Sequence, residues 1–183
     1  MTLAEVSALR LKTELPGDWS CERVPRFVDV LALARGRTMV LVDANKTDRV
    51  DLLVQAVQEA DALDWAIFDT SSLEKIDAAL KLEPRLMIMP RIEDAAQADA
   101  ILSRWPTHPP VLVEIDSAVF PRAADRVHAA GHRVMTNGFA VDVGVKLGQP
   151  PSRYVALYEQ GADVVQSDLP DLVLSALGRT PSP

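Results

Sequence analysis

The feature that most constrains the fold is a short apolar run that recurs along the chain. The runs start at about residues 39, 65, 86, 111, 133 and 163, so their spacing is 21 to 30 residues. Most of these runs end at a polar residue, and a stretch with apolar residues at helical spacing follows each one. Strands that alternate with helices at this interval are typical of parallel βα units joined by right-handed crossovers.

The length of 183 residues is enough for one domain with a real core and too short for two large ones. We therefore expect a single domain over residues 1–178 and a disordered tail over residues 179–183. No glycine-rich phosphate loop of the dinucleotide or P-loop type follows any apolar run, which disfavours a Rossmann fold. A doubly wound sheet of another kind stays open at this point.

Two helices are expected before the first strand. Thr2 and Glu5 have the spacing of a capping box, and Pro25 stands where proline is tolerated at a helix start. Gly36 is expected to end the second helix. Thr47 or Asp48 is the predicted N-cap of the next helix, and further helices are expected after Ser71 and over residues 93–104 and 120–130.

The overall charge and the hydropathy exclude several classes of partner. A net charge of −7 argues against non-specific binding to nucleic acid or to an anionic membrane surface. No apolar stretch approaches the roughly 20 residues that span a bilayer. Met1 is not followed by a basic and then an apolar segment, so no signal peptide is predicted and the cytoplasm is the default expectation.

The carboxyl ends of parallel strands meet on one face, so the polar residues after each run can be considered together. A group rich in carboxylates suits a hard divalent cation such as Mg²⁺ or Ca²⁺. The residues are Asp43, Asn45, Lys46, Asp69, Arg91, Glu114, Asp116, Asn137 and Asp168. For Asp69, Asp116 and Asp168 a helix-capping role is at least as good an interpretation. For Asp43 a functional role is the better interpretation, because other residues that could cap the next helix follow it.

The histidines are placed differently from the carboxylates. His108 and His132 stand before apolar runs and His128 lies in a helical stretch. We therefore expect all three at the amino ends of the strands or on the outer helices. Acid–base chemistry by histidine at the carboxyl-end face is then not available from these residues.

Four stretches resemble the glycerophosphodiester phosphodiesterase family, which has a TIM-barrel fold. "GADVVQSDLPDLVLSAL" is similar to the last strand and helix of that family, and "HRVMTNG" to its seventh strand, with Met135 in place of the usual tryptophan. "MVLVDANK" resembles the third strand. The opening, "TLAEVSALRL" with "CERVPRFVDVLALARGR", resembles the segment between the second and third strands.

The resemblance implies roles for several residues. Asp43 falls on a metal ligand, which implies Mg²⁺ or Ca²⁺ bound weakly because one carboxylate supplies few of the oxygens required. Asn45 falls on a lysine that lines the family's site, and Lys46 follows one position later. Together with Glu114, Asn137 and Asp168, these residues are predicted to bind a small phosphodiester ligand.

The family's two catalytic histidines and its Glu-x-Asp metal pair belong to the first two strands and the segment just after. The matching sequence here begins after them, and a complete barrel of eight strands typically needs about 250 residues. We therefore predict an α/β fold, an incomplete TIM-like barrel with about six parallel strands. No catalytic residue is assigned.

The main functional hypothesis is a relative of these phosphodiesterases, and so of lipid metabolism, that is weakly active or inactive as this chain: a pseudoenzyme candidate. The alternative is a non-catalytic barrel remnant that acts as a binding or oligomerisation module, because open sheet edges invite a homodimer or a partner chain. The amino-terminal helices could instead cover the gap, or the runs at 39 and 163 could pair directly. An unrelated α/β enzyme or a flavodoxin-like sheet also stays open.

Overall fold

The six apolar runs form the six strands of one parallel sheet, in the order β1-β2-β3-β4-β5-β6. The structure is a computed structural model and describes residues 1–10 and 17–179. The strands are β1 (Val40–Asp43), β2 (Ala66–Thr70), β3 (Met87–Ile92), β4 (Val113–Ile115), β5 (Val134–Asn137) and β6 (Val164–Gln166). Each strand pairs only with its neighbours along the chain, which confirms the predicted series of βα units.

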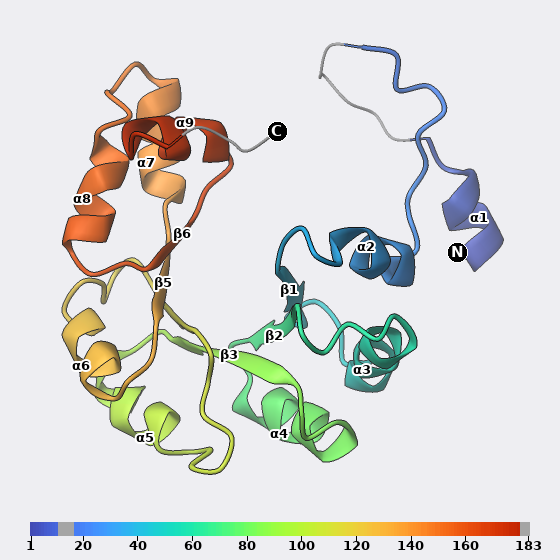
Figure 1. The fold of residues 1–183 in the computed structure, drawn as a ribbon, viewed down its shortest axis with the longest axis horizontal. Helices are drawn as coiled ribbons and strands as arrows, with labels where there is room; N and C mark the ends of the chain where they lie inside the picture. The colour runs from blue at the N-terminus through green and yellow to red at the C-terminus, as the bar shows by residue number, and fades with distance from the viewer. Residues whose placement is uncertain (11–16, 180–183) are drawn as a thin grey trace.

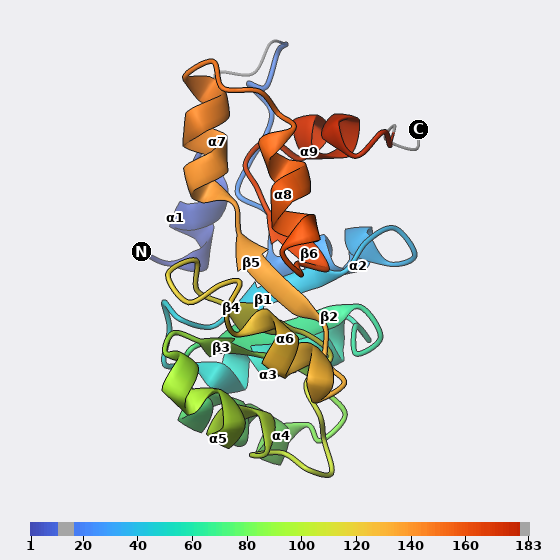
Figure 2. The ribbon, with the colours of Figure 1, turned by 90° about the vertical axis from the view of Figure 1, so that its left-hand side faces the viewer.

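The sheet curls into a half-barrel that does not close. Figures 1 and 2 show the sheet curving from β1 to β6, with helices on its outer side. β1 pairs with β2 and β6 pairs with β5, so the two edge strands do not pair with each other. The incomplete TIM-like α/β barrel is confirmed, and direct pairing of the runs at 39 and 163 is wrong.

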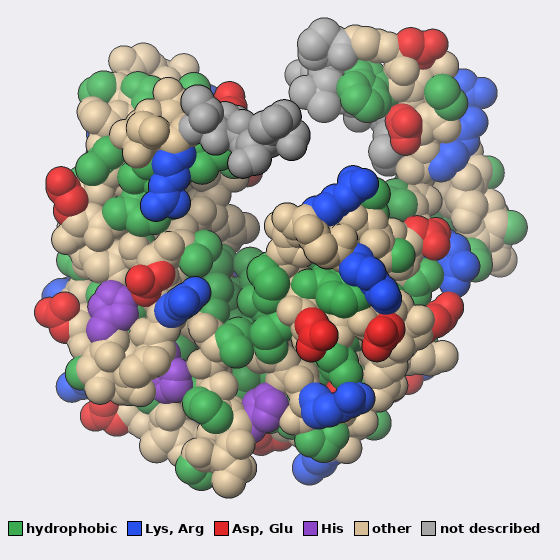
Figure 3. Space-filling model, in the orientation of Figure 1, with side chains coloured by type: hydrophobic (Ala, Val, Ile, Leu, Met, Phe, Trp, Pro, Cys, Tyr) green, Lys and Arg blue, Asp and Glu red, His purple; other side chains and the backbone are tan. Residues whose placement is uncertain are grey.

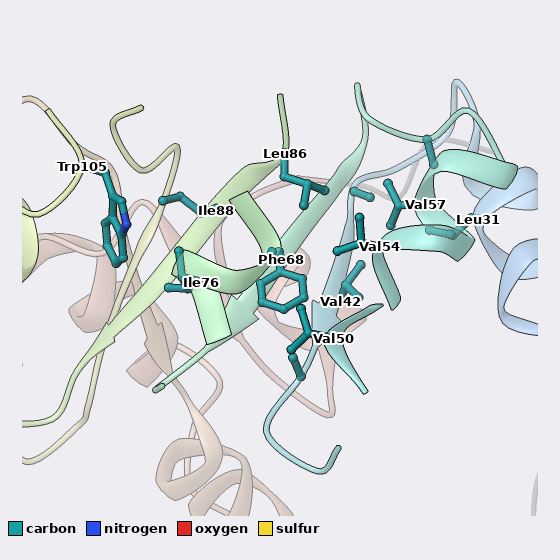
Figure 4. Packing of buried hydrophobic residues seen from close by; sticks show 14 residues of the cluster. Leu31, Val42, Val50, Val54, Val57, Phe68, Ile76, Leu86, Ile88 and Trp105 are labelled. Atoms are coloured by element: carbon teal, nitrogen blue, oxygen red, sulfur yellow. The ribbon is translucent and has the colours of Figure 1, made fainter. Parts of the chain in front are cut away.

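The main core lies between the sheet and the outer helices. Phe68 and Ile88 point outward from β2 and β3 into a cluster that includes Leu31, Val54 and Ile76 (Figure 4). A second cluster covers the outer side of the later strands and is built largely from Val, Ile and Ala, with one Phe. Burial of these aliphatic side chains removes apolar surface from water and holds each helix on its strand.

The inner face of the sheet is divided into an apolar and a polar end. Leu41, Ile67 and Met87 stand near the amino ends of the first three strands, where Leu41 pairs with Ile67 and Ile67 with Met87. Two residues further along each strand the side chains face inward again, because side chains alternate in a strand. At the first two strands these residues are Asp43 and Asp69.

The helices are α1 (Leu3–Ala8), α2 (Phe27–Ala34), α3 (Val50–Glu59), α4 (Leu73–Leu82), α5 (Ala98–Leu102), α6 (Ala124–Ala129), α7 (Phe139–Lys146), α8 (Arg153–Glu159) and α9 (Pro170–Ala176), with a 3₁₀ turn η1 (Ala95–Gln97). The helix expected over 93–104 is therefore a 3₁₀ turn followed by a short helix, and the one expected over 120–130 begins at Ala124. Ser72, not Ser71, caps α4 through the backbone N–H of Lys75. The predicted N-cap at Thr47 or Asp48 is wrong, because the N-cap of α3 is Arg49, without a side-chain cap. The Thr47 hydroxyl accepts from the backbone N–H of Arg49.

The two amino-terminal helices do not cover the open side of the half-barrel. The capping box at Thr2 and Glu5 is present, but α1 contains no buried residue. Helix α2 packs against α3, outside β1, and buries Leu31 there (Figure 1). Covering of the gap by these helices is therefore wrong for the part of the chain that the structure describes.

Residues 180–183, most of the predicted tail, lie outside the described residues, whereas Arg179 is described. Within residues 1–10 and 17–179, none of the helices has the length and apolar character to cross a membrane.

Candidate functional site at the carboxyl rim

Four charged side chains meet at the carboxyl ends of the first four strands because the strand register puts them on one face. Asp43 of β1 pairs with Asp69 of β2, and Arg91 of β3 pairs with Glu114 of β4. Asp69 also pairs with Met89, two residues before Arg91, so all four side chains share the inner face. We call this set the carboxyl-rim cluster.

Arg91 lies at the centre of the carboxyl-rim cluster. Its Nε and Nη2 atoms donate to the two carboxylate oxygens of Asp69 at 2.8 and 2.6 Å, a bidentate pair. The Glu114 Oε2 atom lies 2.9 Å from the same Nε, and the Asp43 Oδ2 atom lies 4.0 Å from Nη2. One guanidinium thus faces three carboxylates.

Burial shifts the pKa values of the two inner carboxylates. The side chains of Asp69 and Glu114 are 4% and 9% exposed. Burial raises the pKa of Asp69, against the hydrogen bonds and the charge of Arg91, and the Asp43 charge raises it further. Burial also raises the pKa of Glu114, and Arg91 counters it. The carboxylates in turn raise the pKa of Arg91, which stays a cation.

Asp43, the predicted metal ligand, is more exposed and already partly used. Its Oδ1 atom accepts from the backbone N–H of Asn45 at 2.8 Å and from the Asn45 side-chain amide at 2.7 Å. Burial alone would raise the pKa of Asp43, but these hydrogen bonds, with the charges of Arg91 and Lys46, lower it overall. Asp43 is therefore an ionised carboxylate with Oδ2 as its less committed oxygen.

The side chain of Asn45 joins the ends of two strands. Its carbonyl oxygen accepts from the hydroxyl of Thr70 at 3.1 Å and from the backbone N–H of Ser71 at 3.0 Å. Its amide donates to Asp43, as described. The hydrogen-bonding groups of Asn45 are thus used within the fold, and Lys46, which is exposed beside Asp43, is the freer of the two for an anionic ligand.

Asn137 and Asp168 line a separate pocket of about 220 Å³ at the ends of β5 and β6. The Asn137 side-chain oxygen accepts from the N–H of Phe139 at 2.8 Å, which starts α7. The Asp168 carboxylate lies 3.6 Å from Lys146, and both groups are more than half exposed. The predicted rim residues therefore form two sites, one around Arg91 and one here.

A buried carboxylate in this second pocket is not among the predicted site residues. Asp142 of α7 accepts from the Tyr154 hydroxyl at 2.5 Å, the Ser167 hydroxyl at 2.6 Å and the backbone N–H of Asp168 at 2.7 Å. Burial pushes the pKa of Asp142 up, but these hydrogen bonds lower it overall. The signal in the sequence is an aspartate within the apolar helical stretch "FAVDVGV".

None of the three aspartates caps the helix that follows it. Asp116 precedes α6, whose N-cap is Ala123 without a side-chain cap, and its carboxylate accepts from the N–H of Ala118 at 2.8 Å in the turn after β4. Asp69 does not cap the next helix, because both its oxygens bind Arg91 and Ser72 caps α4. Asp168 does not cap α9, whose N-cap is Leu169 without a side-chain cap, and its carboxylate has the contact with Lys146 described above.

All three histidines lie away from the carboxyl-rim cluster, as predicted. His108 contacts the carbonyl oxygen of Leu86, just before β3, and His132 contacts that of Pro110, before β4. The His128 ring on α6 lies 2.9 Å from the Asp163 carboxylate, just before β6. These contacts hold the imidazoles at the amino ends of the strands.

The residues of the rim do not fit a divalent metal ion as they stand. Among the residues that the structure describes, no group of three or more His, Cys, Asp or Glu side chains is arranged to hold one. Both oxygens of Asp69 are bound by Arg91, and one oxygen of Asp43 by Asn45. As they stand, these side chains therefore do not form a metal site.

A curled sheet of six parallel strands with helices outside and polar residues at the carboxyl rim defines an incomplete TIM-like α/β barrel. Solved structures that share this fold are glycerophosphodiester phosphodiesterases. No protein-family model and no curated protein sequence matches the chain.

Three solved structures illustrate the similarity. An enzyme of this name from Parabacteroides distasonis has a TM-score of 0.78 and 20% identity, over 97% of this chain and 63% of its own. One from Agrobacterium tumefaciens has a TM-score of 0.72 and 18% identity, over 96% and 71%. Another from P. distasonis has a TM-score of 0.65 and 14% identity, over 97% and 71%. The chain thus spans about two thirds of the length of these proteins.

Proposed function

We propose that this chain carries the scaffold of a glycerophosphodiester phosphodiesterase and that, by itself, it has little or no hydrolytic activity. The observation that carries the proposal is the position of the three imidazoles at the amino ends of the strands or on α6. General acid–base catalysis needs a proton donor and acceptor within hydrogen-bond reach of the reacting group, about 2.6–3.2 Å. The imidazoles do not supply one at the carboxyl rim.

A small phosphodiester at this rim would contact the exposed side chains of Lys46 and Asp43. Asn45 and Glu114 would lie deeper in the site. Asn137 and Asp168 would bind such a ligand in the second pocket. Any contact of Mg²⁺ or Ca²⁺ with Asp43 would be too weak to saturate, since useful sites for these ions gather several oxygens.

The test is an assay of the purified chain with glycerophosphocholine in the presence of Mg²⁺ or Ca²⁺, with release of glycerol 3-phosphate as the readout. We expect no turnover above that of the Asp43→Asn variant. Metal-dependent turnover by the unaltered chain that Asp43→Asn abolishes would show that the proposal is wrong.

A second candidate function, a binding or oligomerisation module, is favoured by the open side of the half-barrel. An apolar groove of about 510 Å³ lies at the amino-end half of the inner face, lined among others by Met39, Leu41, Met87 and Val164. Figure 3 shows hydrophobic side chains along the hollow between the two ends of the sheet. Both edge strands, β1 and β6, border this groove and leave one side of the backbone unpaired.

A homodimer or a partner chain that adds strands to these edges would cover both the groove and the unpaired backbone. Light scattering of the chain between about 1 and 100 µM is the test, and we expect a mass above that of the 20.0 kDa chain. Leu41→Lys should lower the mass, because it puts a charge at the edge. Leu52→Lys is the control, since Leu52 is also an exposed leucine but lies on α3. A monomer at all concentrations would count against this candidate.

A further inference from the structure

The charge arrangement at the carboxyl-rim cluster leads to an inference about metal binding that does not depend on whether the chain hydrolyses a phosphodiester. Clusters of carboxylate oxygens on one face of a site ordinarily hold a hard cation, which neutralises them. Here the cation at the centre of Asp43, Asp69 and Glu114 is the guanidinium of Arg91. We propose that Arg91 is the resident cation of this rim and excludes a divalent metal ion, so that removal of its side chain creates a metal site.

The first argument is occupation of the ligand atoms. Mg²⁺ and Ca²⁺ bind carboxylate oxygens at about 2.0–2.6 Å. Both oxygens of Asp69 already accept N–H groups of Arg91 at 2.6 and 2.8 Å, in a fixed bidentate geometry. A metal ion could not reach Asp69 without displacement of the guanidinium.

The second argument is the energetic need for a cation. Asp69 and Glu114 are buried, and a buried carboxylate is stable as an ion only when it is paired. The Arg91 side chain is itself only 25% exposed, and its backbone lies in β3, between β2 and β4. The fold thus supplies the positive charge from within, and an external cation has no charge left to neutralise at Asp69.

The third argument is an acceptor that Arg91 does not satisfy. The Oε2 atom of Glu114 is buried and has no hydrogen-bond donor among residues 1–10 and 17–179, although it lies 2.9 Å from the Arg91 Nε atom. The reason is direction, because the same Nε donates its hydrogen to Asp69. Glu114 therefore has a free ligand oxygen that faces the centre of the cluster, as a metal ligand would once Arg91 is removed.

The experiment is calorimetric titration of Ca²⁺ and Mg²⁺ into the unaltered chain and into Arg91→Met. We expect no saturable binding by the unaltered chain and saturable one-site binding of Ca²⁺ by the variant, with a dissociation constant of about 1 mM or lower. Glu114→Gln combined with Arg91→Met should weaken that binding at least about tenfold, because a ligand oxygen loses its charge.

Arg104→Met is the matched control. Arg104 forms a similar bidentate pair with Asp77, at 2.6 and 3.5 Å, but it joins the turn after α5 to α4, away from the rim. Its loss should create no Ca²⁺ binding. Arg91→Lys keeps a positive charge at the cluster and should also bind no Ca²⁺.

Arg91→Met removes the positive charge between two buried carboxylates, Asp69 and Glu114. Their repulsion can leave the variant unfolded. In that case the readout is the circular-dichroism spectrum, which we expect Ca²⁺ to restore, since a ligand of the native state stabilises it. The proposal is overturned if the unaltered chain binds Ca²⁺ at or below about 1 mM through Asp43, or if the folded or unfolded Arg91→Met variant does not respond to Ca²⁺ or Mg²⁺.

Discussion

Substitution of a buried carboxylate that accepts three or more hydrogen bonds is expected to lower the stability of this protein. Asp142 is the clearest case, because its donors come from α8, from Ser167 and from the backbone of Asp168. The carboxylate thus links α7 to α8 and to the segment that follows β6. The same reasoning applies to Glu83, which ends α4.

We predict that Asp142→Asn lowers the free energy of unfolding by about 1–3 kcal/mol, since the charge that strengthens three hydrogen bonds is lost inside the protein. Urea unfolding measures the change, and hydrogen exchange should increase near Asp168. Asp171→Asn, an exposed change on α9, should stay within about 0.5 kcal/mol. An equal effect of both substitutions would contradict the assignment.

Glu83 gives a prediction about pH. Hydrogen bonds from Arg85 and Gln58 lower the pKa of Glu83 to about 2. Because the pKa is lower in the folded than in the unfolded chain, the stabilisation is present above the unfolded value and is lost as the pH falls toward about 2.

The measurement compares urea midpoints of Glu83→Gln and the unaltered chain at pH 7 and near pH 2. We expect a lower midpoint for the variant at pH 7 and a smaller difference at the acidic pH. Glu59→Gln, which removes only an exposed ion pair with Arg26 at 3.5 Å, should shift the midpoint much less. A difference for Glu83→Gln that does not change with pH would contradict the role of its charge.

At the residue scale, part of the site could be predicted from the sequence and part could not. Asp43 and Glu114 follow from their position at the ends of apolar runs, which parallel topology brings to one face. The central role of Arg91 depends on the register of β3 against its neighbours, which an apolar run does not reveal. Asp142 lies within a helix, so the strand-exit argument does not find it.

At the scale of elements, the helices differ in how far they depend on packing. Helix α1 has a complete capping box but no buried residue, whereas α4 has a single cap at Ser72 and buries Ile76 and Ala79. A cap is worth about 1 kcal/mol to a helix, but it contributes to global stability only when the helix folds together with the core.

We therefore predict opposite readouts for two cap substitutions. Thr2→Ala should speed amide exchange in α1 and leave the urea midpoint unchanged, since α1 contributes no core. Ser72→Ala should lower the free energy of unfolding by about 1 kcal/mol. A comparable loss of global stability from Thr2→Ala would mean that α1 is part of the cooperative unit.

The strands were more predictable than the helices, and the reason is physical. A strand buried on both faces is apolar over most of its length, so the runs at 65 and 133 locate β2 and β5 to within about two residues. Helices α5 and α6 are short, and turns precede them, so their apolar spacing extends beyond the helical residues. Helix limits are also set by caps that several nearby polar residues could provide.

At the scale of the whole molecule, the two faces of the sheet contribute unequally to stability. The outer face packs under helices and holds Phe68, which is 1% exposed, whereas Leu41 on the inner face is 38% exposed. The half-barrel leaves its interior open toward the gap between β1 and β6, so part of the inner wall has no layer above it.

We expect Phe68→Ala to cost about 3–5 kcal/mol, as for other buried aromatic residues, because it leaves a cavity in the main core. Leu41→Ala should cost less than about 1 kcal/mol in the isolated chain, since little burial is lost. Urea unfolding at low protein concentration checks both values. If a partner or a second copy covers the groove, the cost of Leu41→Ala should rise with protein concentration.

The strand order has a consequence for how the chain reaches its native state. Every strand pairs only with the strands that come directly before and after it in the chain, at separations of some 20 to 30 residues. Pairing therefore closes only modest loops, and each new unit adds to an existing edge without rearrangement of earlier ones. Assembly can begin at any adjacent pair and spread in either direction, as in a solenoid protein, and the sheet could grow by whole units at both ends.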